Sequence, residues 1–325
     1  MRVLVTGAFG QIGTELTEHL RAMHGSDQVM AADIRPPRAG SPAAGQPWVH
    51  LDVTDARALE SLLTEHRFET IYHLAAILSG KGEENPQAAY HVNMTGTMNV
   101  LEAARKHGVG RLFLPSSIAV FGQDSPRDMT PNETVLRPGS MYGITKVAGE
   151  LLLEYYVQRY GLDVRSLRFP GIISYKTEPG GGTTDYAVDI FVHAVQGRRY
   201  RCFLTEGTRL PFMYMKDVIR AVDALMDAPA ELLTRRCYNI SGFSADPGDF
   251  IREIRRVYGD FAVSFKPDFR QDIADSWPRS VDDSPARQDW GWHPEYDLSR
   301  VSQDMLKHVS QILQQAPGLG CLPGA

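Results

Sequence analysis

This chain of 325 residues has few cysteines, no long apolar run and no excess of positive charge. Its three cysteines, Cys202, Cys237 and Cys321, stand too far apart for a zinc knuckle or a dense disulfide framework. No apolar run is long enough to span a bilayer, and an apolar segment begins within the first five residues, which leaves no room for a targeting peptide. A formal net charge of −5 argues against nucleic acid as the main partner. We therefore expect a cytoplasmic protein that holds no metal and binds no membrane.

Apolar, strand-like runs alternate with helical patterns through the first 170 residues. Continuous apolar strands between helices are typical of a parallel sheet that is covered on both faces. The expected strands are 2–6, 28–33, 48–52, 70–74, 111–116 and 163–169, and the expected helices are 11–23, 56–66, 87–106 and 142–160. The sequence therefore predicts an α/β fold of the Rossmann type, with a doubly wound parallel sheet.

A glycine-rich turn separates the first expected strand from the first expected helix. Its spacing, Gly-x-x-Gly-x-x-Gly over residues 7–13, permits a tight turn and brings backbone amides close to a pyrophosphate at the helix N-terminus. Asp33 ends the second strand, where a carboxylate binds both ribose hydroxyls and repels a 2′-phosphate; this favours NAD over NADP, although the nearby Arg35 softens the preference. The predicted NAD-binding residues from the turn and the strand ends are Gly7, Gly10, Gln11, Ile12, Gly13, Asp33, Asp52, Val53, Leu74, Ala75 and Ala76.

Two polar residues near these strand ends have alternative interpretations. Asp52 is placed to meet the adenine amine, or it serves as a turn carboxylate together with Thr54 and Asp55. His73 precedes Leu74, Ala75 and Ala76 at the end of the fourth strand, and we expect it to be a hydrogen-bonded core histidine rather than a catalyst.

The pattern changes after residue 170. Residues 174–184 are rich in Gly, Thr and Pro and are expected to form a loop, and 201–215 to be extended. Further helices are expected at 185–196, 216–227, 249–258 and 297–314, a returning strand at 237–240, and irregular structure over 268–292. We predict an NAD-binding Rossmann domain over 1–170 with 216–240 returning to it, a smaller α/β substrate-binding lobe over 171–215 and 241–315, and a flexible tail over 316–325.

Tyr142 and Lys146 are four residues apart and share one face of the helix expected over 142–160. A cation beside a phenol stabilises the phenolate and lowers the tyrosine pKa from about 10, which makes the tyrosine a general base near neutral pH. With 13 Tyr and 7 Lys, chance alone gives about 0.3 such pairs, so the pair gains weight only from its neighbours. Ser117 follows the fifth strand, where ligands lie in open α/β sheets, and its hydroxyl is placed to bind the substrate oxygen that Tyr142 deprotonates.

Together, the glycine turn, Asp33, Ser117, Tyr142 and Lys146 resemble the extended short-chain dehydrogenase/reductase superfamily over nearly the whole chain. The resemblance implies that Ser117, Tyr142 and Lys146 are catalytic. It implies cofactor contacts from Asn93, Tyr142, Lys146 and Pro170, with Asn93 supporting the lysine through water. It also implies a homodimer that forms through the helices expected at 87–106 and 142–160.

At two places this sequence differs from the pattern of other superfamily members, and each difference disfavours one type of reaction. Its dehydratases carry an acid pair directly after the catalytic hydroxyl residue, whereas Ile118 and Ala119 stand there and transfer no protons. Its epimerases usually carry an asparagine after the sixth strand, whereas residues 167–171 contain none. Plain oxidation of an alcohol is therefore favoured.

Three longer blocks, over 115–122, 174–188 and 275–280, are similar to the short-chain type of L-threonine 3-dehydrogenase. This resemblance implies oxidation of the L-threonine β-hydroxyl to 2-amino-3-oxobutanoate, with hydride transfer to NAD. Threonine is a zwitterion that needs both donors and acceptors. Asp185 is placed to meet its ammonium or to cap the next helix, and Trp277 to wall the pocket or to pack in the lobe. The predicted substrate-binding residues are Ser79, Ser117, Tyr142, Thr183, Thr184, Asp185 and Trp277.

Two other functions stay open at this point. An NAD-dependent nucleotide-sugar 4-epimerase would need donors for a diphosphate, for which Arg198, Arg199, Arg201 and Arg209 are the candidates. A non-catalytic NAD sensor on the same fold is disfavoured by the intact Ser117, Tyr142 and Lys146.

Overall fold

The computed structural model describes residues 1–38, 41, 43–177 and 180–315, so the predicted tail over 316–325 lies outside the described residues. Its centre is an eight-stranded sheet in the order β11-β7-β5-β4-β1-β2-β3, with β6 beside β7, and every pair is parallel. The strands are β1 (Val3–Thr6), β2 (Val29–Asp33), β3 (Trp48–His50), β4 (Thr70–His73), β5 (Arg111–Phe113), β6 (Ser116–Ser117), β7 (Asp163–Phe169) and β11 (Cys237–Asn239).

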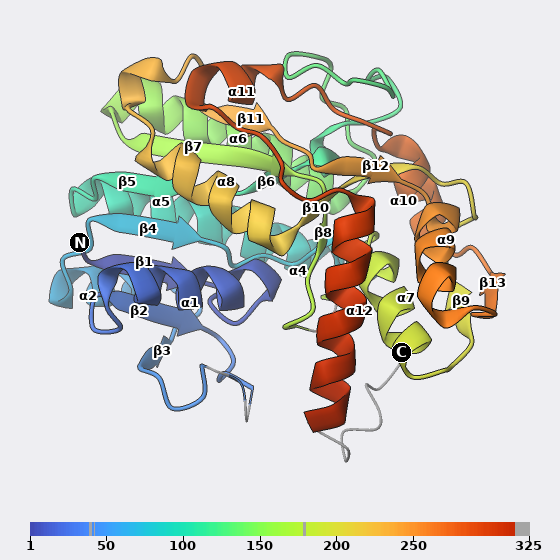
Figure 1. Ribbon diagram of the computed structural model, residues 1–325. Helices are drawn as coiled ribbons and strands as arrows, with labels where there is room; N and C mark the ends of the chain where they lie inside the picture. Colours follow the sequence, from blue (N-terminus) through green and yellow to red (C-terminus); the bar gives the residue numbers. More distant parts are fainter. Residues whose placement is uncertain (39–40, 42, 178–179, 316–325) are drawn as a thin grey trace.

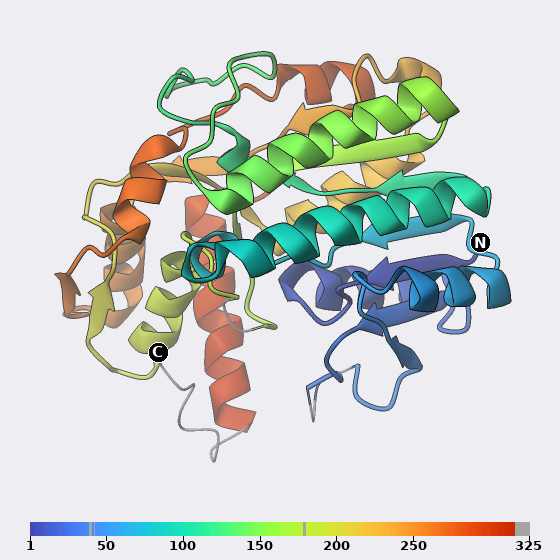
Figure 2. The same cartoon turned by 180° about the vertical axis from the view of Figure 1, so that it is seen from behind.

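Helices cover both faces of this sheet, as the apolar strands require. Figure 1 shows α1 (Gln11–His24) and α8 (Met215–Asp227) on one face. Figure 2 shows α2 (Ala56–Glu65), α5 (Gly96–Lys106) and α6 (Met141–Tyr160) on the other. The predicted Rossmann fold class is therefore confirmed, including the strand that returns near residue 237.

A second group of elements lies beyond the carboxyl ends of the parallel strands (Figure 1). Its strands are β8 (Gly171–Ile173), β10 (Leu210–Tyr214) and β12 (Phe243–Ala245) in one sheet, and β9 (Tyr200–Cys202) with β13 (Val263–Phe265) in another. Its helices are α7 (Tyr186–Val195), α9 (Pro247–Tyr258), α10 (Arg270–Ser276) and α12 (Leu298–Gln315). Tyr186, Phe191, Phe212 and Phe250 pack together in its core. The domain boundaries stated above stay a prediction.

Several expected elements were wrong in detail. The single helix over 87–106 is α4 (Pro86–Tyr90), a π-helical segment (His91–Thr95) and α5. The strand over 111–116 is broken into β5 and β6, and 201–215 holds two short strands. Residues 268–292 are not irregular, since they contain α10 and α11 (Ser284–Trp290), two helices too short to show a clear periodicity. A further short helix, α3 (Ser79–Glu84), was not predicted, and single 3-10 turns occupy Ile118–Val120 and Ala230–Leu232.

Candidate active site

One pocket of about 430 Å³ runs along the carboxyl edge of the sheet, from the glycine turn to the second group of elements. It brings together most of the predicted site residues. Those that line it are Gly7, Gly10, Gln11, Ile12, Gly13, Leu74, Ala76, Ser79, Ser117, Tyr142, Lys146, Pro170, Thr183, Thr184, Asp185 and Trp277. The predicted residues that do not line it are Asp33, Asp52, Val53, Ala75 and Asn93.

The glycine turn leaves room for a ligand because side chains are excluded there. Gly7 has a φ of +67°, and a Cβ at that position would lie 2.6 Å from the backbone nitrogen of Ala75. A Cβ on Gly13 would lie 2.1 Å from the carbonyl oxygen of Gly7. The backbone of Ala75 thus packs directly against the turn at Gly7. The bare backbone at the start of α1 is the cradle that a dinucleotide pyrophosphate requires, so the residues present fit NAD.

The carboxylate of Asp33 is buried and held in a fixed orientation at the end of β2. Its Oδ2 accepts the backbone N–H of Phe9 at 3.0 Å, and its Oδ1 accepts the N–H of Arg35 at 3.1 Å. Each oxygen keeps a lone pair for a ribose hydroxyl. Asp52 is exposed instead and accepts both the N–H and the hydroxyl of Thr54, as the turn interpretation predicted.

The sequence around residue 140 fixes the start of α6 and with it the position of Tyr142. Ser140 is the N-cap, and its Oγ accepts the N–H of Gly143 at 3.1 Å. Tyr142 lies in the first turn, where its hydroxyl is hydrogen-bonded to Ser117. One turn later, the Lys146 ammonium lies 5.4 Å from the centre of the Tyr142 ring and donates to the carbonyl oxygen of Pro115 at 2.8 Å.

Burial acts on both groups and moves their pKa values towards the neutral forms. It raises the pKa of Tyr142 to about 12, against a smaller opposing effect of the Ser117 hydrogen bond. It lowers the pKa of Lys146 to about 8, against the opposing charge of Glu150. The sequence predicted that the Lys146 cation lowers the pKa of Tyr142, whereas burial raises it.

A small cavity of about 20 Å³ lies behind Lys146 and is large enough for one water molecule. Asn93 lines it, but its side chain already donates to Thr145 and bonds both the N–H and the carbonyl of Ile77, so it ties the end of β4 to α6. His73 also lines the cavity. Burial lowers its pKa to about 3 and its Nδ1 pairs with the Thr6 hydroxyl at 2.8 Å, as expected of a neutral core histidine.

Glu150 lies near the site and was not predicted from the sequence. It forms a buried two-point ion pair with Arg168, at 2.7 and 2.8 Å, and accepts a hydrogen bond from Ser116. Its signal was available, because Glu150 continues the four-residue spacing of Tyr142 and Lys146 along one helix face.

The far end of the pocket is held together by hydrogen bonds between distant segments. The hydroxyls of Ser79 and Thr183 lie 3.0 Å apart, and the Thr183 N–H donates to Ser79 Oγ at 3.2 Å. Asp185 does not cap α7 through its side chain; its Oδ2 accepts the N–H groups of Gly181 and Gly182 at 2.8 and 2.7 Å. Trp277 is 5% exposed and both lines the pocket and packs in the neighbouring core, so its two interpretations hold together.

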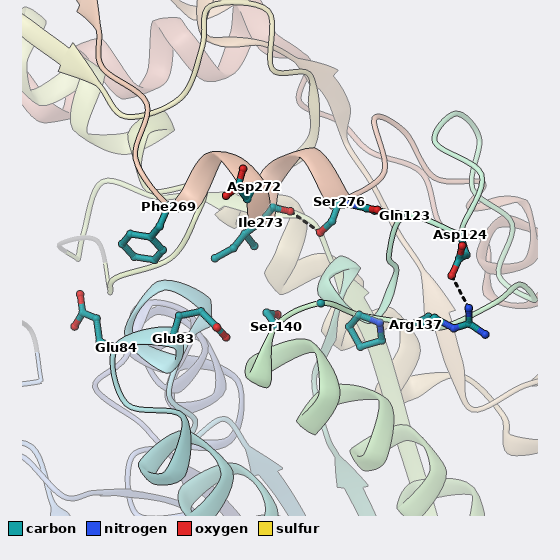
Figure 3. Close-up of a pocket in the computed structure, with 12 residues that line it drawn as sticks. Glu83, Glu84, Gln123, Asp124, Arg137, Ser140, Phe269, Asp272, Ile273 and Ser276 are labelled. Atoms are coloured by element: carbon teal, nitrogen blue, oxygen red, sulfur yellow. Dashed lines mark hydrogen bonds and ion pairs between the residues drawn. The ribbon is translucent and has the colours of Figure 1, made fainter.

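A second, more open pocket of about 870 Å³ adjoins this end and contains none of the predicted residues (Figure 3). Its wall comes from α3, α10 and the segment 123–140. Glu83 and Ser140 belong to it, and both contact the start of α6.

Comparisons with known proteins agree with this geometry. The profile of the NAD dependent epimerase/dehydratase family matches residues 3–241. An uncharacterized epimerase/dehydratase of Staphylococcus haemolyticus (strain JCSC1435) is 45% identical over 95% of this chain and 98% of its own. The chain therefore belongs to the NAD dependent epimerase/dehydratase family, which confirms the expected extended short-chain superfamily.

Solved structures give similar results. A holo form of a GalE-like L-threonine dehydrogenase from Cupriavidus necator is 46% identical, with a TM-score of 0.92 over 95% of this chain and 100% of that chain. A monomeric L-threonine 3-dehydrogenase from a metagenome is 45% identical, with a TM-score of 0.92 over 95% and 99%. UDP-glucose 4-epimerase of Thermotoga maritima is 22% identical with a TM-score of 0.86 over 96% and 100%, which shows a shared fold alone.

Proposed function

We propose that this member of the NAD dependent epimerase/dehydratase family oxidises the β-hydroxyl of L-threonine to 2-amino-3-oxobutanoate. The observation that carries the proposal is that one pocket contains two pairs of hydroxyl groups, each of which we call a seat. The Ser117 and Tyr142 hydroxyls form a seat for an alcohol, and Ser79 with Thr183 supplies paired hydroxyls close by for a small polar substrate. The similarity to L-threonine dehydrogenases at 43–46% identity supports the same substrate.

The chain's own residues account for the proton transfer. Ser117 hydrogen-bonds the substrate β-oxygen, and Tyr142, acting as a phenolate, accepts the proton of that hydroxyl. Lys146 stabilises the phenolate by its charge, and its bond to Pro115 fixes the ammonium beside the helix. Bound NAD supplies the hydride acceptor and a positive charge that further favours the phenolate. The glycine turn and Asp33 hold the pyrophosphate and the ribose.

Elimination and epimerisation have weaker support. Ile118 and Ala119 are buried next to Ser117 and offer no acid or base for a dehydratase. Of the arginines considered for a nucleotide-sugar diphosphate, Arg209 is paired with Asp246 and Asp249. None of Arg198, Arg199, Arg201 and Arg209 lines the described part of the pocket.

We also propose a cytoplasmic homodimer that uses NAD. Leu151, Tyr155 and Tyr160 on α6 and Met98 on α5 are between 39% and 63% exposed, and together they offer an apolar surface for a second copy. Within the part of the chain that the structure describes, no helix is long and apolar enough to cross a bilayer.

The test is formation of NADH, followed by its absorbance, when the purified protein is mixed with NAD and L-threonine. L-serine and L-allo-threonine serve as substrate controls, and UDP-glucose as the epimerase control. We expect NADH to accumulate with L-threonine. Conversion of UDP-glucose without net NADH would favour the epimerase instead.

A further inference from the structure

The short helix α3 contacts both halves of the proposed active site. At its beginning, Ser79 bonds Thr183, and the N–H of Lys81 donates to the carbonyl oxygen of Gly181 at 3.2 Å. A Cβ on Gly80 would lie 2.7 Å from that same Gly181 oxygen. The helix and the glycine loop that includes Gly181 are therefore in direct backbone contact.

At its end, α3 contacts the first turn of α6. Oε1 of Glu83 accepts the backbone N–H of Met141, the first residue of α6, at 2.7 Å. Figure 3 shows Glu83 turned towards Ser140 at the start of α6, and Glu84 turned away from it. Glu83 and Ser140 together satisfy N–H groups on both sides of Tyr142, groups that no helical carbonyl can satisfy at a helix start.

Gly82 faces the first turn of α6, because a Cβ added to it would come into ordinary contact with the Cβ of Tyr142, at 3.8 Å. The bond from Met141 to Glu83 is therefore the direct link between α3 and the turn that carries Tyr142. Ser79 and Glu83 are four positions apart on the same short helix.

We infer that Glu83 is a positioning residue, which fixes Tyr142 relative to the Ser79–Thr183 seat by holding the N–H of Met141. The inference rests on the proposed function, because it concerns the distance between the tyrosine oxygen and a substrate bound at that seat. Glu83 lies in the wall of the second pocket and does not line the pocket that holds the predicted site residues. Small misplacements of a reacting group are costly, so losing this bond should reduce turnover by about tenfold.

The experiment compares Glu83→Ala, Glu83→Gln and Glu84→Ala in the full chain. Glu84 is the matched control, since it is the adjacent carboxylate in the same pocket wall and is exposed. We expect Glu83→Ala to lower kcat about tenfold, with the KM for NAD changed by less than about twofold. Glu83→Gln keeps an oxygen acceptor and should recover most of the turnover, and Glu84→Ala should match the wild type.

Hydrogen exchange of the amides of residues 141–143 gives a second measurement that needs no substrate. Exchange should accelerate in Glu83→Ala and not in Glu84→Ala. If Glu83→Ala does not fold, Glu83→Asp replaces it, because its shorter side chain draws the carboxylate away from Met141. Equal kcat and equal exchange in the Glu83 and Glu84 variants would overturn the inference, and so would a glutamine variant as slow as the alanine one. A wild type inactive on L-threonine would instead overturn the proposed function, and the exchange data would still decide on the bond.

Discussion

The two ends of the pocket are built in different ways. At the cofactor end, the shape comes from absent side chains: a Cβ on Gly7 or Gly13 would collide with backbone atoms. At the substrate end, the shape comes from hydrogen bonds between segments about a hundred residues apart, such as Ser79 with Thr183, and from Glu83 with Met141. The glycines of the first end form a short sequence motif, although Gly7 also packs against Ala75, whereas the second end depends on side-chain bonds between distant segments.

This difference separates two kinds of function. A backbone cradle binds any ligand with the same pyrophosphate, which suits a cofactor shared among many enzymes of one fold. Where side chains are held by distant partners, a few substitutions are enough to alter the contacts that a substrate makes. Such side chains therefore distinguish one substrate from another. Variants at the two ends should therefore affect different kinetic constants.

The largest effect is expected at the point where the two ends meet. Tyr142→Phe removes the proposed base and keeps the ring, so kcat for L-threonine should fall by about a thousandfold. The Kd for NAD, measured by calorimetry, should change by less than about twofold, because the cradle is untouched. Wild-type turnover in this variant would show that the tyrosine is not the base.

Loss of the neighbouring cation should be visible in the pH profile. A positive charge favours the phenolate, so Lys146→Met should raise the pKa of Tyr142 and move the acid limb of the kcat profile to higher pH. At neutral pH we expect turnover to fall by about a hundredfold. The profile is measured from pH 6 to 10 with the exposed Lys307→Met as the control. An unchanged midpoint would contradict the role given to Lys146.

At the cofactor end, a single methyl group should distinguish two neighbouring glycines. A Cβ on Gly13 would lie 2.1 Å from the Gly7 oxygen, whereas one on Gly10 would lie 3.4 Å from that atom. Gly13→Ala should lower the free energy of unfolding by about 1–3 kcal/mol, as overpacking does, and weaken NAD binding. Gly10→Ala should lose less than about 1 kcal/mol in the same urea titration. Equal losses would remove the steric argument for the turn.

The smallest effect is expected at the substrate end. Ser79→Ala removes one hydroxyl from the seat, and the KM for L-threonine should rise by about tenfold while the KM for NAD stays unchanged. Ser302→Ala, a buried serine on α12 whose hydroxyl has no partner among the described residues, is the control. A rise in the KM for NAD instead would place Ser79 at the wrong end of the pocket.

The sequence predicted the large sheet and its strand positions well, because buried parallel strands leave continuous apolar runs. Sixteen of the predicted site residues line one pocket, because they follow strand ends or lie in the loops and helix starts next to them. Glu83 and α3 were not foreseen, since a helix of six residues leaves no periodic pattern and its bond to Met141 spans 58 positions. The role expected for the Asp185 side chain as a helix cap was wrong, because the carboxylate bonds the glycine loop before it.

The same limit applies to electrostatics. Spacing along a helix showed that Lys146 lies beside Tyr142, but it gave no measure of burial. Burial raises the pKa of the tyrosine and lowers that of the lysine. Only the three-dimensional structure shows that burial is the largest influence on both pKa values.

The proposed threonine oxidation is tested most directly by following the hydrogen on the β-carbon. The protein is incubated with NAD and L-threonine carrying deuterium at C3, and the reduced cofactor is analysed by mass spectrometry. The proposed reaction predicts one deuterium in each NADH formed, together with a slower initial rate than with unlabelled threonine. Reduced cofactor without deuterium, or no reduction at all, would contradict it.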